Sequence, residues 1–508
     1  MTRMFARHNV LFLVILLVPA SSYATNGMNL EGYGPEATAM GGASMAYDNG
    51  SAAVMNNPAT IGLMPSNHRL DVALGQLGPD VNATATTPNG VFSADSSGTA
   101  YYMPAVGWVK KSGQFGFGFG VFGQGGMGTE FAADSWMSSP GGLGTPALPN
   151  TTHPALINRS EVGVGRIILP LTFNLNKQVV VGASVDFVWA GMDLQMAMSD
   201  DQFENIANPA AQTIGTASGK LSESFGAMYE PFDPTNTVKG IKTLHHAYFD
   251  FSNDSDFTGE AMGIGFAGKL GIAMQLTKKM SIGATYHSKT KLSDLETSNA
   301  TMTMAIEGDD GIFSGQLASA NYVNYDIPVT GKITVNNFQW PEMIGFGIAL
   351  RPIEDLLLVA DVKRIGWSDV MDKFSMTFVA DANQANPLAG GFAGQQLDVA
   401  LFQNWKDQTV IALGAGYNVT DALTVRAGFN HASNPVPDKY LNALFPAIVE
   451  DHVTAGVGYK FRGGSSVDLS VQKALEVDFT NPGDGNMLPP VTSTHSQLSW
   501  QLMYSYQY

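Results

Sequence analysis

Side chains that could carry out catalysis or bind a metal ion are few and scattered along this sequence. The chain has nine histidines and no cysteine. It has no Gly-x-Ser-x-Gly segment of the kind that presents a serine nucleophile. His245 and His246 are adjacent, so in a strand their side chains would point to opposite faces. The sequence therefore predicts no catalytic residue, no metal site and no cofactor.

Two further motifs carry chemistry in other proteins but lack the necessary context here. Residues 118–123 read Gly-Phe-Gly-Val-Phe-Gly, which matches the glycine pattern of a dinucleotide-binding turn. That turn needs a helix directly after it, whereas Gln124, Gly125 and Gly126 follow. The acidic residues within 250–256 lack the glycine and the terminal glutamate of an EF-hand loop. We expect no nucleotide site, and a loop calcium site stays open as the weaker alternative to a solvated loop.

The elements that would position any site show most clearly at the end of the chain. From Ser496 to Tyr508 every second residue is apolar or aromatic, namely Leu498, Trp500, Leu502, Tyr504, Tyr506 and Tyr508. The residues between them are mostly polar. Successive side chains of a strand point to opposite faces, so one face meets an apolar medium and the other meets water. Lipid outside and a watery lumen inside produce this pattern, which predicts an all-β, transmembrane antiparallel β-barrel.

The N-terminus has the three-part layout of a secretory signal peptide. Arg3 and Arg7 precede an apolar run from Val10 to Val18, and small residues follow up to Ala24. This arrangement predicts a signal peptide over residues 1–24 that is removed on export. The apolar run is too short for a membrane-spanning helix, which needs about 20 residues.

Composition and charge narrow the possible partners. The chain is 44% hydrophobic but only 14% charged, and without cysteine it forms no disulfide. Removing Arg3 and Arg7 with the signal peptide shifts the formal net charge from −17 to −19. This acidity excludes nucleic acid as the expected partner, because nucleic acids select basic surfaces.

Connections of two lengths alternate along the chain. Short turns fall at residues 111–113, 174–177, 277–279, 352–355, 418–421 and 463–465. Long loops fall at residues 80–97, 125–157, 199–255, 300–325, 381–405, 433–449 and 480–493. Short periplasmic turns and long extracellular loops are typical of outer-membrane barrels, and this alternation predicts about 14 strands over residues 66–508. Loop 199–255 is long enough to hold short helices within residues 207–225.

Residues 25–65 do not read as a strand. They are rich in Gly, Ala, Asn and Met and include the run Asn57-Pro58-Ala59. A barrel of this size has a lumen too wide for its own side chains to fill. We expect this segment to form an N-terminal hatch that plugs the lumen, and a flexible periplasmic tail is the alternative.

Several stretches resemble the FadL/TodX family of outer-membrane transporters of long-chain fatty acids and aromatic hydrocarbons. Residues 26–43 (NGMNLEGYGPEATAMGGA), together with Asn57-Pro58-Ala59, resemble the hatch of that family. Residues 125–131 (GGMGTEF), 340–343 (WPEM) and 434–437 (NPVP) resemble later segments of the family in the same order. The resemblance extends from residue 26 to the C-terminus.

The resemblance implies a mechanism and a set of site residues. A hydrophobic ligand would enter an apolar pocket from the extracellular loops and leave sideways through a kink in the third strand. Gly125 and Gly126, with Gly120 and Gly123, would supply that kink. Met28 would contribute to the ligand pocket, because the matching position in the family enters it.

The sequence departs from the fatty-acid pattern at two positions. Where the fatty-acid transporter has two basic residues for the ligand carboxylate, this chain has Met196 and Asn404. Lys406 is near the second position, and Arg426 could also serve if it faces the lumen. Without such a cation a neutral hydrocarbon is favoured, because a buried carboxylate needs a partner.

We therefore predict transport of hydrophobic compounds by passive diffusion in the outer membrane of a Gram-negative bacterium. The expected partners are a hydrophobic small-molecule ligand and outer-membrane lipids, and the expected state is a monomer. A general diffusion porin is the main alternative, and an outer-membrane hydrolase is a weaker one.

Overall fold

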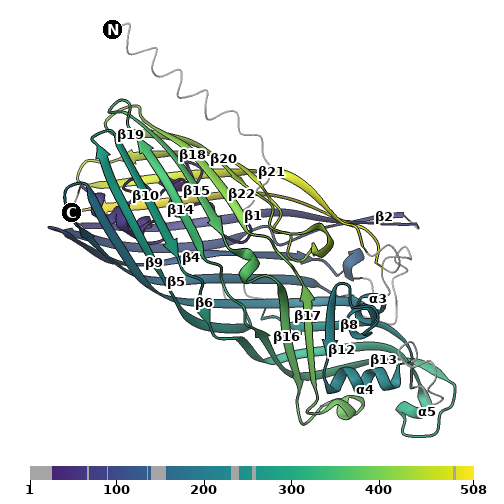
Figure 1. The fold of residues 1–508 in the computed structure, drawn as a ribbon. Coiled ribbons are helices and arrows are strands. Elements are labelled where there is room, and N and C mark those ends of the chain that lie inside the picture. The colour runs from purple at the N-terminus through teal and green to yellow at the C-terminus, as the bar shows by residue number, and fades with distance from the viewer. Residues whose placement is uncertain are drawn as a thin grey trace.

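The computed structural model describes residues 26–65, 68–88, 90–133, 135–138, 156–229, 240–253, 259–483 and 488–508. The predicted signal peptide over residues 1–24 lies outside the described residues. The described chain forms a tall β-barrel with strongly tilted strands (Figure 1). No helix in these ranges is long and apolar enough to cross a bilayer.

The barrel closes through an unbroken circuit of antiparallel strand pairs. In order around the circuit, the strands are β1 (His68–Thr87), β3 (Tyr101–Ser112), β4 (Phe115–Phe131), β5 (Asn158–Asn174), β6 (Val179–Ser199), β9 (Ala261–Thr277), β10 (Met280–His287), β14 (Met343–Leu350), β15 (Leu356–Ile365), β18 (Gln408–Asn418), β19 (Leu423–Ala432), β20 (Asp451–Lys460), β21 (Ser465–Asn481) and β22 (Val491–Gln507). Strand β22 pairs with β1 and thereby closes the ring. The predicted class, a closed antiparallel barrel, is confirmed.

The sheet contains more strands than the simple alternation of turns predicted. Within the described ranges it has 22 strands, and those outside the closing circuit are β2 (Gly90–Asp95), β7 (Gly215–Ser218), β8 (Ile241–Phe251), β11 (Lys291–Leu292), β12 (Leu295–Asp309), β13 (Tyr322–Asn336), β16 (Lys373–Ala380) and β17 (Gln396–Phe402). They extend the wall on the side away from the C-terminus (Figure 1). The estimate of about 14 strands thus fails for the whole sheet, because several predicted loops are themselves paired strands.

Two predicted loops show this difference. Strand β1 continues to Thr87 and pairs with β2, although residues 80–97 were expected to be a loop. Residues Leu295 to Asp309 of β12 pair with residues Tyr322 to Val335 of β13. Both ends of the predicted loop 300–325 are therefore strands. Loop 199–255 does contain two helices, α3 (Asp200–Ala207) and α4 (Lys220–Met228), together with the short strand β7. The remaining short helices outside the N-terminal segment are η3 (Trp136–Ser138), α5 (Asp310–Phe313), η4 (Trp367–Asp369), η5 (Pro387–Phe392) and η6 (Asp438–Tyr440).

The outer face of the barrel is apolar. Large hydrophobic side chains stand exposed on every side of the ring, including Leu169 at 58%, Phe266 at 61% and Phe346 at 62%. Leu498, Leu502, Tyr504 and Tyr506 of β22 are exposed as the sequence predicted, whereas Ser499, Met503 and Ser505 are buried. A wide exposed apolar surface on a closed sheet fits contact with lipid.

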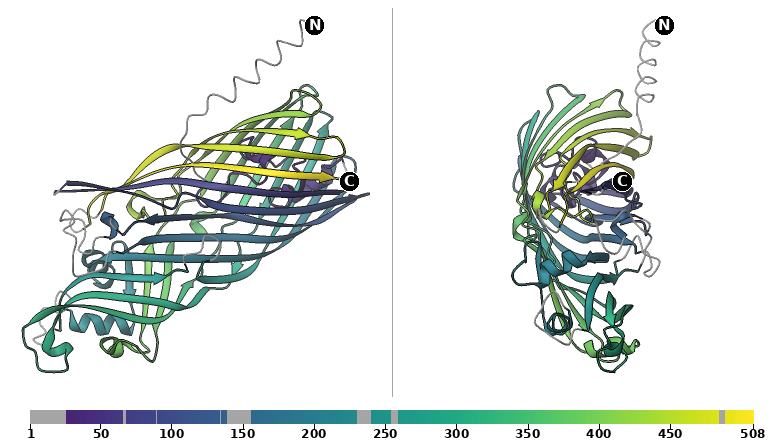
Figure 2. Two further views of the ribbon diagram at one scale, coloured as in Figure 1. Left: turned by 180° about the vertical axis from the view of Figure 1, so that it is seen from behind. Right: turned by 90° about the vertical axis from the view of Figure 1, so that its right-hand side faces the viewer.

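Residues 26–64 lie inside the ring of strands, as the purple segment in Figures 1 and 2 shows. The segment contains three short helices, α2 (Pro35–Thr38), η1 (Gly50–Val54) and η2 (Pro58–Leu63). Glycines of the wall allow its backbone to approach closely. A Cβ added at Gly283 would lie 1.8 Å from the carbonyl oxygen of Met45, and one at Gly428 would lie 2.2 Å from the amide nitrogen of Gly41.

Candidate functional site

Asn57, Pro58 and Ala59 are buried and fix the N-terminal segment to the wall at β6 and β9. The Asn57 side chain accepts a hydrogen bond from the amide of Ala59 at 3.1 Å and starts the helix η2. Its Nδ2 donates to the carbonyl oxygens of Met45 at 2.8 Å and Ile272 at 3.1 Å. One side chain thus links two parts of the segment and one wall strand.

Charged side chains of the wall hold the same segment from another side. Asp361 on β15 accepts hydrogen bonds from the amides of Ser44 at 2.6 Å and Met45 at 3.1 Å. Lys363, two residues further on the same strand, donates to the carbonyl oxygens of Glu31 at 3.1 Å and Gly42 at 2.7 Å. Buried charges are tolerated only when they are paired or hydrogen bonded, so these contacts tie the segment firmly to β15.

Glu36 of α2 lies between two arginines of the wall. Its carboxylate contacts Arg69 at 3.3 Å and Arg426 at 3.2 Å. Burial opposes ionisation of this carboxyl, but the two guanidinium groups outweigh burial and hold the pKa of Glu36 below its usual value. Arg426 also pairs with Asp468 at 2.8 Å. It is therefore not available to bind a ligand carboxylate, the role that the sequence left open for it.

The wall is interrupted between β3 and β4. The two strands pair from Ser112–Phe115 to Val106–Val121, and no pairing with β3 continues along β4 beyond Val121. Residues Tyr101 to Ala105 of β3 keep only the pairing with β1 on the other edge of the strand. A bulge lies in β4 between Gly123 and Gly125, where the register with β5 shifts.

The N-terminal segment supplies part of the pairing that β3 does not. The amide of Gly126 donates to the carbonyl oxygen of Met28 at 3.0 Å, and the amide of Leu30 donates to that of Gln124 at 3.5 Å. A Cβ at Gly125 would lie 2.0 Å from the carbonyl oxygen of Met28. Glycine is thus required at position 125 for this close approach.

A cavity of about 340 Å³ lies at the interruption. Its lining comes from both sides of the break and includes Tyr102, Met103, Gly125, Gly126, Val162 and Met262. Tyr102 and Met262 are 44% and 48% exposed, whereas Val162 is 3% exposed. The cavity therefore joins the barrel interior to its outer, lipid-facing surface.

A second, small cavity of about 20 Å³ is rich in methionine. Met28, Met192, Met196 and Met371 line it together with Phe338, Phe374, Phe445, Val162, Leu194, Leu401, Gln403 and Asn442. The structure thus brings Met28 and Met196 together, and Val162 is shared with the cavity at the wall interruption. Methionine is flexible and can open space for ligands of varied shape. The described residues that line this cavity include no lysine, arginine or histidine.

Asn404 and Lys406 lie apart from this pocket. Both are exposed, in the segment between β17 and β18. The Asn404 backbone has a φ of 47°, and its amide donates to the carbonyl oxygen of Asp372. The Lys406 amide donates to the carbonyl oxygen of Pro435. Neither side chain lines one of the cavities described here.

Met196 also faces a wider cavity of about 260 Å³ at the mouth of the barrel. This mouth cavity is lined by the start of α3, by residues 439–444 and by the end of β17. Phe203 of α3 and Phe225 of α4 pack edge to face at 5.4 Å, which holds the two helices together. The mouth cavity and the methionine pocket share Met196, Leu401, Gln403 and Asn442, so they are neighbours.

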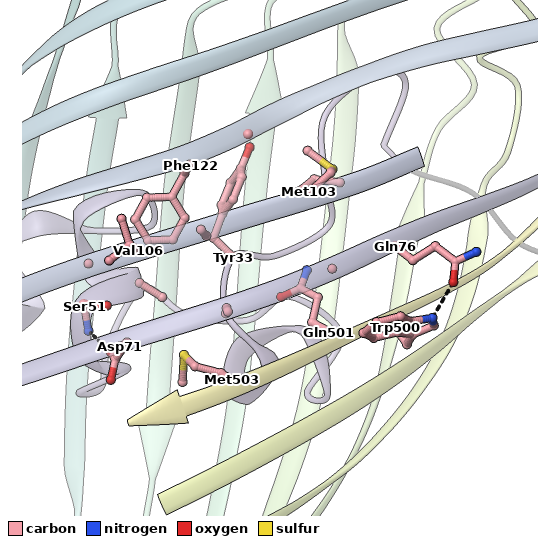
Figure 3. Close-up of a pocket in the computed structure, with 18 of the residues that line it drawn as sticks. Tyr33, Ser51, Asp71, Gln76, Met103, Val106, Phe122, Trp500, Gln501 and Met503 are labelled. Atoms are coloured by element: carbon pink, nitrogen blue, oxygen red, sulfur yellow. Dashed lines mark hydrogen bonds between the residues drawn. The ribbon is translucent and has the colours of Figure 1, made fainter. Parts of the chain in front are cut away.

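A smaller cavity of about 40 Å³ extends from the interruption along the N-terminal segment (Figure 3). Tyr33 and Phe122 face it from one side, and Met503 and Gln501 from the other. The hydroxyl of Tyr33 donates to the carbonyl oxygen of Gln124 at 2.5 Å. Burial raises the pKa of Tyr33 well above its usual value, so this hydroxyl keeps its proton and remains a donor to the bulge.

A buried charge cluster beside the bulge was missed by the sequence analysis. Asp186 on β6 pairs with Arg166 on β5 at 2.8 Å and with Lys269 on β9. All three side chains are almost fully buried. Arg166 also donates to the side-chain oxygen of Gln124, the bulged residue of β4. The three residues come from three strands, so only the strand register brings them together.

The described residues contain no group of three His, Cys, Asp or Glu side chains placed to hold a metal ion. The arrangement that they do contain is a closed barrel with an apolar outer face, residues 26–64 inside the ring of strands, and a cavity through its wall. This combination defines a transport barrel of the outer membrane.

Comparison with known proteins agrees with this class. The profile of the family described as outer membrane protein transport protein (OMPP1/FadL/TodX) matches residues 12–487. The chain belongs to this family and is located in the outer membrane of a Gram-negative bacterium. The resemblance noted in the sequence is confirmed.

Individual relatives support the assignment. The crystal structure of the toluene transporter TodX of P. putida has a TM-score of 0.73 and 27% identity, covering 94% of this chain and 99% of that one. The long-chain fatty acid transport protein of Escherichia coli (strain K12) is 24% identical over 442 residues, 85% of this chain and 83% of the relative. An uncharacterized Chlorobium limicola protein is 48% identical over only 71 residues, and this match spans 35% of its length.

The charge cluster generates a first prediction. Asp186→Leu leaves Arg166 and Lys269 buried without their counter-ion, and breaking such a buried pair costs about 3–5 kcal/mol. The exposed pair of Lys332 with Glu296, at 2.7 Å, offers a matched control. Glu296→Leu should cost at most about 1 kcal/mol, because exposed ion pairs contribute little. Urea-induced unfolding in lipid measures both, and equal losses for the two variants would show that the cluster does not stabilise the barrel.

Proposed function

We propose that this protein moves neutral hydrophobic compounds passively across the outer membrane and releases them sideways through its wall. Neutral compounds such as aromatic and aliphatic hydrocarbons are the first class, ahead of long-chain fatty acids as the second class. The known relatives are named for toluene and for long-chain fatty acids, respectively. Transport without catalysis accounts for the site.

The interruption between β3 and β4 carries this proposal. A hydrophobic molecule pays about 25 cal/mol for each Å² of apolar surface kept in water. The methionine pocket and the wall cavity share Val162, and the wall cavity reaches Met262 on the outer face. A ligand on this route stays in contact with apolar side chains from the mouth to the lipid.

The lack of a cation favours neutral ligands. A carboxylate moved into the methionine pocket would lose its hydration and find no lysine or arginine among the lining residues. Lys439 lines the mouth cavity, where a charged head group could remain hydrated. The proposal therefore places hydrocarbons ahead of fatty-acid anions.

The axial route is unfavourable for such ligands. Residues 26–64 fill the lumen, and a cavity of about 1100 Å³ on their periplasmic side is lined by charged residues such as Arg69, Lys111, Arg351 and Lys460. We assign the segment the role of a plug, as the sequence analysis expected of residues 25–65. Because pocket, plug and exit all come from one chain, we expect the monomer to be the working unit.

Two glycines of β18 test the plug. A Cβ at Gly414 would lie 2.3 Å from the Cβ of Met40, whereas one at Gly416 would meet the Met40 sulfur at 3.5 Å, an ordinary contact. Gly414→Ala should push the segment from the wall and raise ion conductance in planar bilayers above the very low value expected for the unchanged protein. Gly416→Ala should leave conductance unchanged. Porin-like conductance of the unchanged protein, or identical traces for both variants, would remove the plug.

A disulfide across the interruption tests lateral release. A Cβ at Gly123 on β4 would lie 3.8 Å from the Cβ of Met103 on β3. Disulfide-bonded cysteines have Cβ atoms about 3.5–4.5 Å apart. In Met103→Cys/Gly123→Cys, oxidation should close the exit and stop uptake of radiolabelled toluene, and dithiothreitol should restore it. The natural chain has no cysteine that could interfere.

A second disulfide provides the control. A Cβ at Gly116 would lie 3.6 Å from that of Thr172, its paired residue on β5. Gly116→Cys/Thr172→Cys joins two strands that are already paired, so oxidation should not change uptake. Undiminished uptake through the oxidised Met103–Gly123 variant would rule out the lateral exit.

A further inference from the structure

One side chain that lines the wall cavity between β3 and β4 carries a buried hydrogen-bonding atom that has no partner. His495 of β22 lines this cavity and is 4% exposed. Its Nε2 is buried and makes no hydrogen bond with any described residue. A buried polar atom without a partner is costly, so such an atom in an otherwise apolar cavity calls for a ligand group or water.

The other ring nitrogen defines what Nε2 can bind. Nδ1 of His495 lies 2.6 Å from the carbonyl oxygen of Pro446. A carbonyl oxygen only accepts, so Nδ1 carries the proton and donates it. In the uncharged ring Nε2 then has a free lone pair and accepts hydrogen bonds.

The histidine ring is held in place by the chain around it. Pro446 is separated by Phe445 from Leu444, whose carbonyl oxygen accepts a hydrogen bond from the hydroxyl of Thr129 at 3.1 Å. Thr129 belongs to β4 and lines the same cavity. The loop that orients His495 is thus anchored to the strand that forms the exit.

Three other polar side chains of the lining are already engaged. Thr129 bonds to Leu444, Glu161 pairs with Arg159 at 2.9 Å, and Gln497 donates to the hydroxyl of Ser499 at 3.1 Å. The His495 acceptor differs from them because nothing in the described chain uses it.

We propose that His495 makes the wall cavity selective for hydrophobic compounds with one hydroxyl group, such as phenols and alcohols, over the parent hydrocarbons. The inference rests on the proposed function, because it assigns a substrate class to the same exit cavity. A hydroxyl donates to Nε2, whereas a hydrocarbon or an ether leaves the acceptor unpaired. One neutral hydrogen bond corresponds to a preference of roughly 3- to 10-fold.

Three ligands with one skeleton test the proposal: nonylbenzene, 4-nonylphenol and 4-nonylanisole. Binding to the purified full-length protein in detergent gives the ratio of the affinities for the phenol and for each of the other two ligands. Comparing this ratio between variants cancels the partitioning of each ligand into detergent. The unchanged protein should favour the phenol over both others. His495→Phe should bring the ratio of phenol to nonylbenzene down by roughly 3- to 10-fold and leave nonylbenzene binding as tight or tighter.

Three further variants complete the design. His431, a partly exposed histidine of β19 that pairs with Asp451 of β20, provides the control, and His431→Phe should keep the unchanged ratio. If His495→Phe fails to fold, judged by heat-modifiable gel mobility, His495→Leu replaces it, and His495→Gln should retain part of the preference through its amide oxygen. A ratio that survives loss of His495, or an anisole bound as tightly as the phenol, overturns the proposal. Failure of all three ligands to bind the unchanged protein would instead contradict the proposed function.

Discussion

Strands β3 and β4 do not pair beyond Val106 and Val121. The rest of the structure depends on how the backbone N–H and C=O groups left unpaired there are satisfied. In lipid, each unpaired N–H or C=O group costs several kcal/mol, so barrels normally close every strand pair. Here the amide of Gly126 donates a hydrogen bond to the carbonyl oxygen of Met28. The carbonyl oxygen of Gln124 accepts hydrogen bonds from the amide of Leu30 and the hydroxyl of Tyr33. The N-terminal segment thus takes the place of a strand and allows a gap in the wall to persist.

Keeping that segment in position requires strong anchors, and these are the buried charges of the lumen. Asp361 and Lys363 hold its backbone, and Glu36 joins it to Arg69 and Arg426. The cluster around Asp186 reaches the bulge itself through Gln124. Buried ion pairs of this kind seldom add stability over apolar packing, but losing one partner is costly, so they favour one arrangement of the N-terminal segment against the wall.

Much of the fold could be predicted from sequence because the membrane imposes a two-sided pattern. The alternation from Ser496 to Tyr508 and the short turns locate wall strands correctly, since one face meets lipid. The extension of β1 to Thr87 and the pairing of β12 with β13 were missed. Residues 82–87 alternate only alanine with asparagine and threonine, and this contrast in polarity is too weak to mark the two faces of a strand.

The site was only partly predictable for a related reason. Met28 and Met196 do share a pocket. The exposed positions of Asn404 and Lys406 depend on the turn at Asn404, which has a positive φ and whose direction sequence spacing does not reveal. The contact of Asp186 with Arg166 and Lys269 depends on the register of three strands, and the free nitrogen of His495 on a loop that folds into the lumen.

Locating a bound hydrocarbon directly tests the central claim that ligands leave through the wall. Crystals soaked with 4-bromotoluene would reveal the bromine by its anomalous scattering. The account predicts bromine density between β3 and β4, beside Met103 and Val162, in the cavity that opens toward Met262. Density only in the charged periplasmic cavity beside Arg69 and Lys111, with none at the wall, would contradict it.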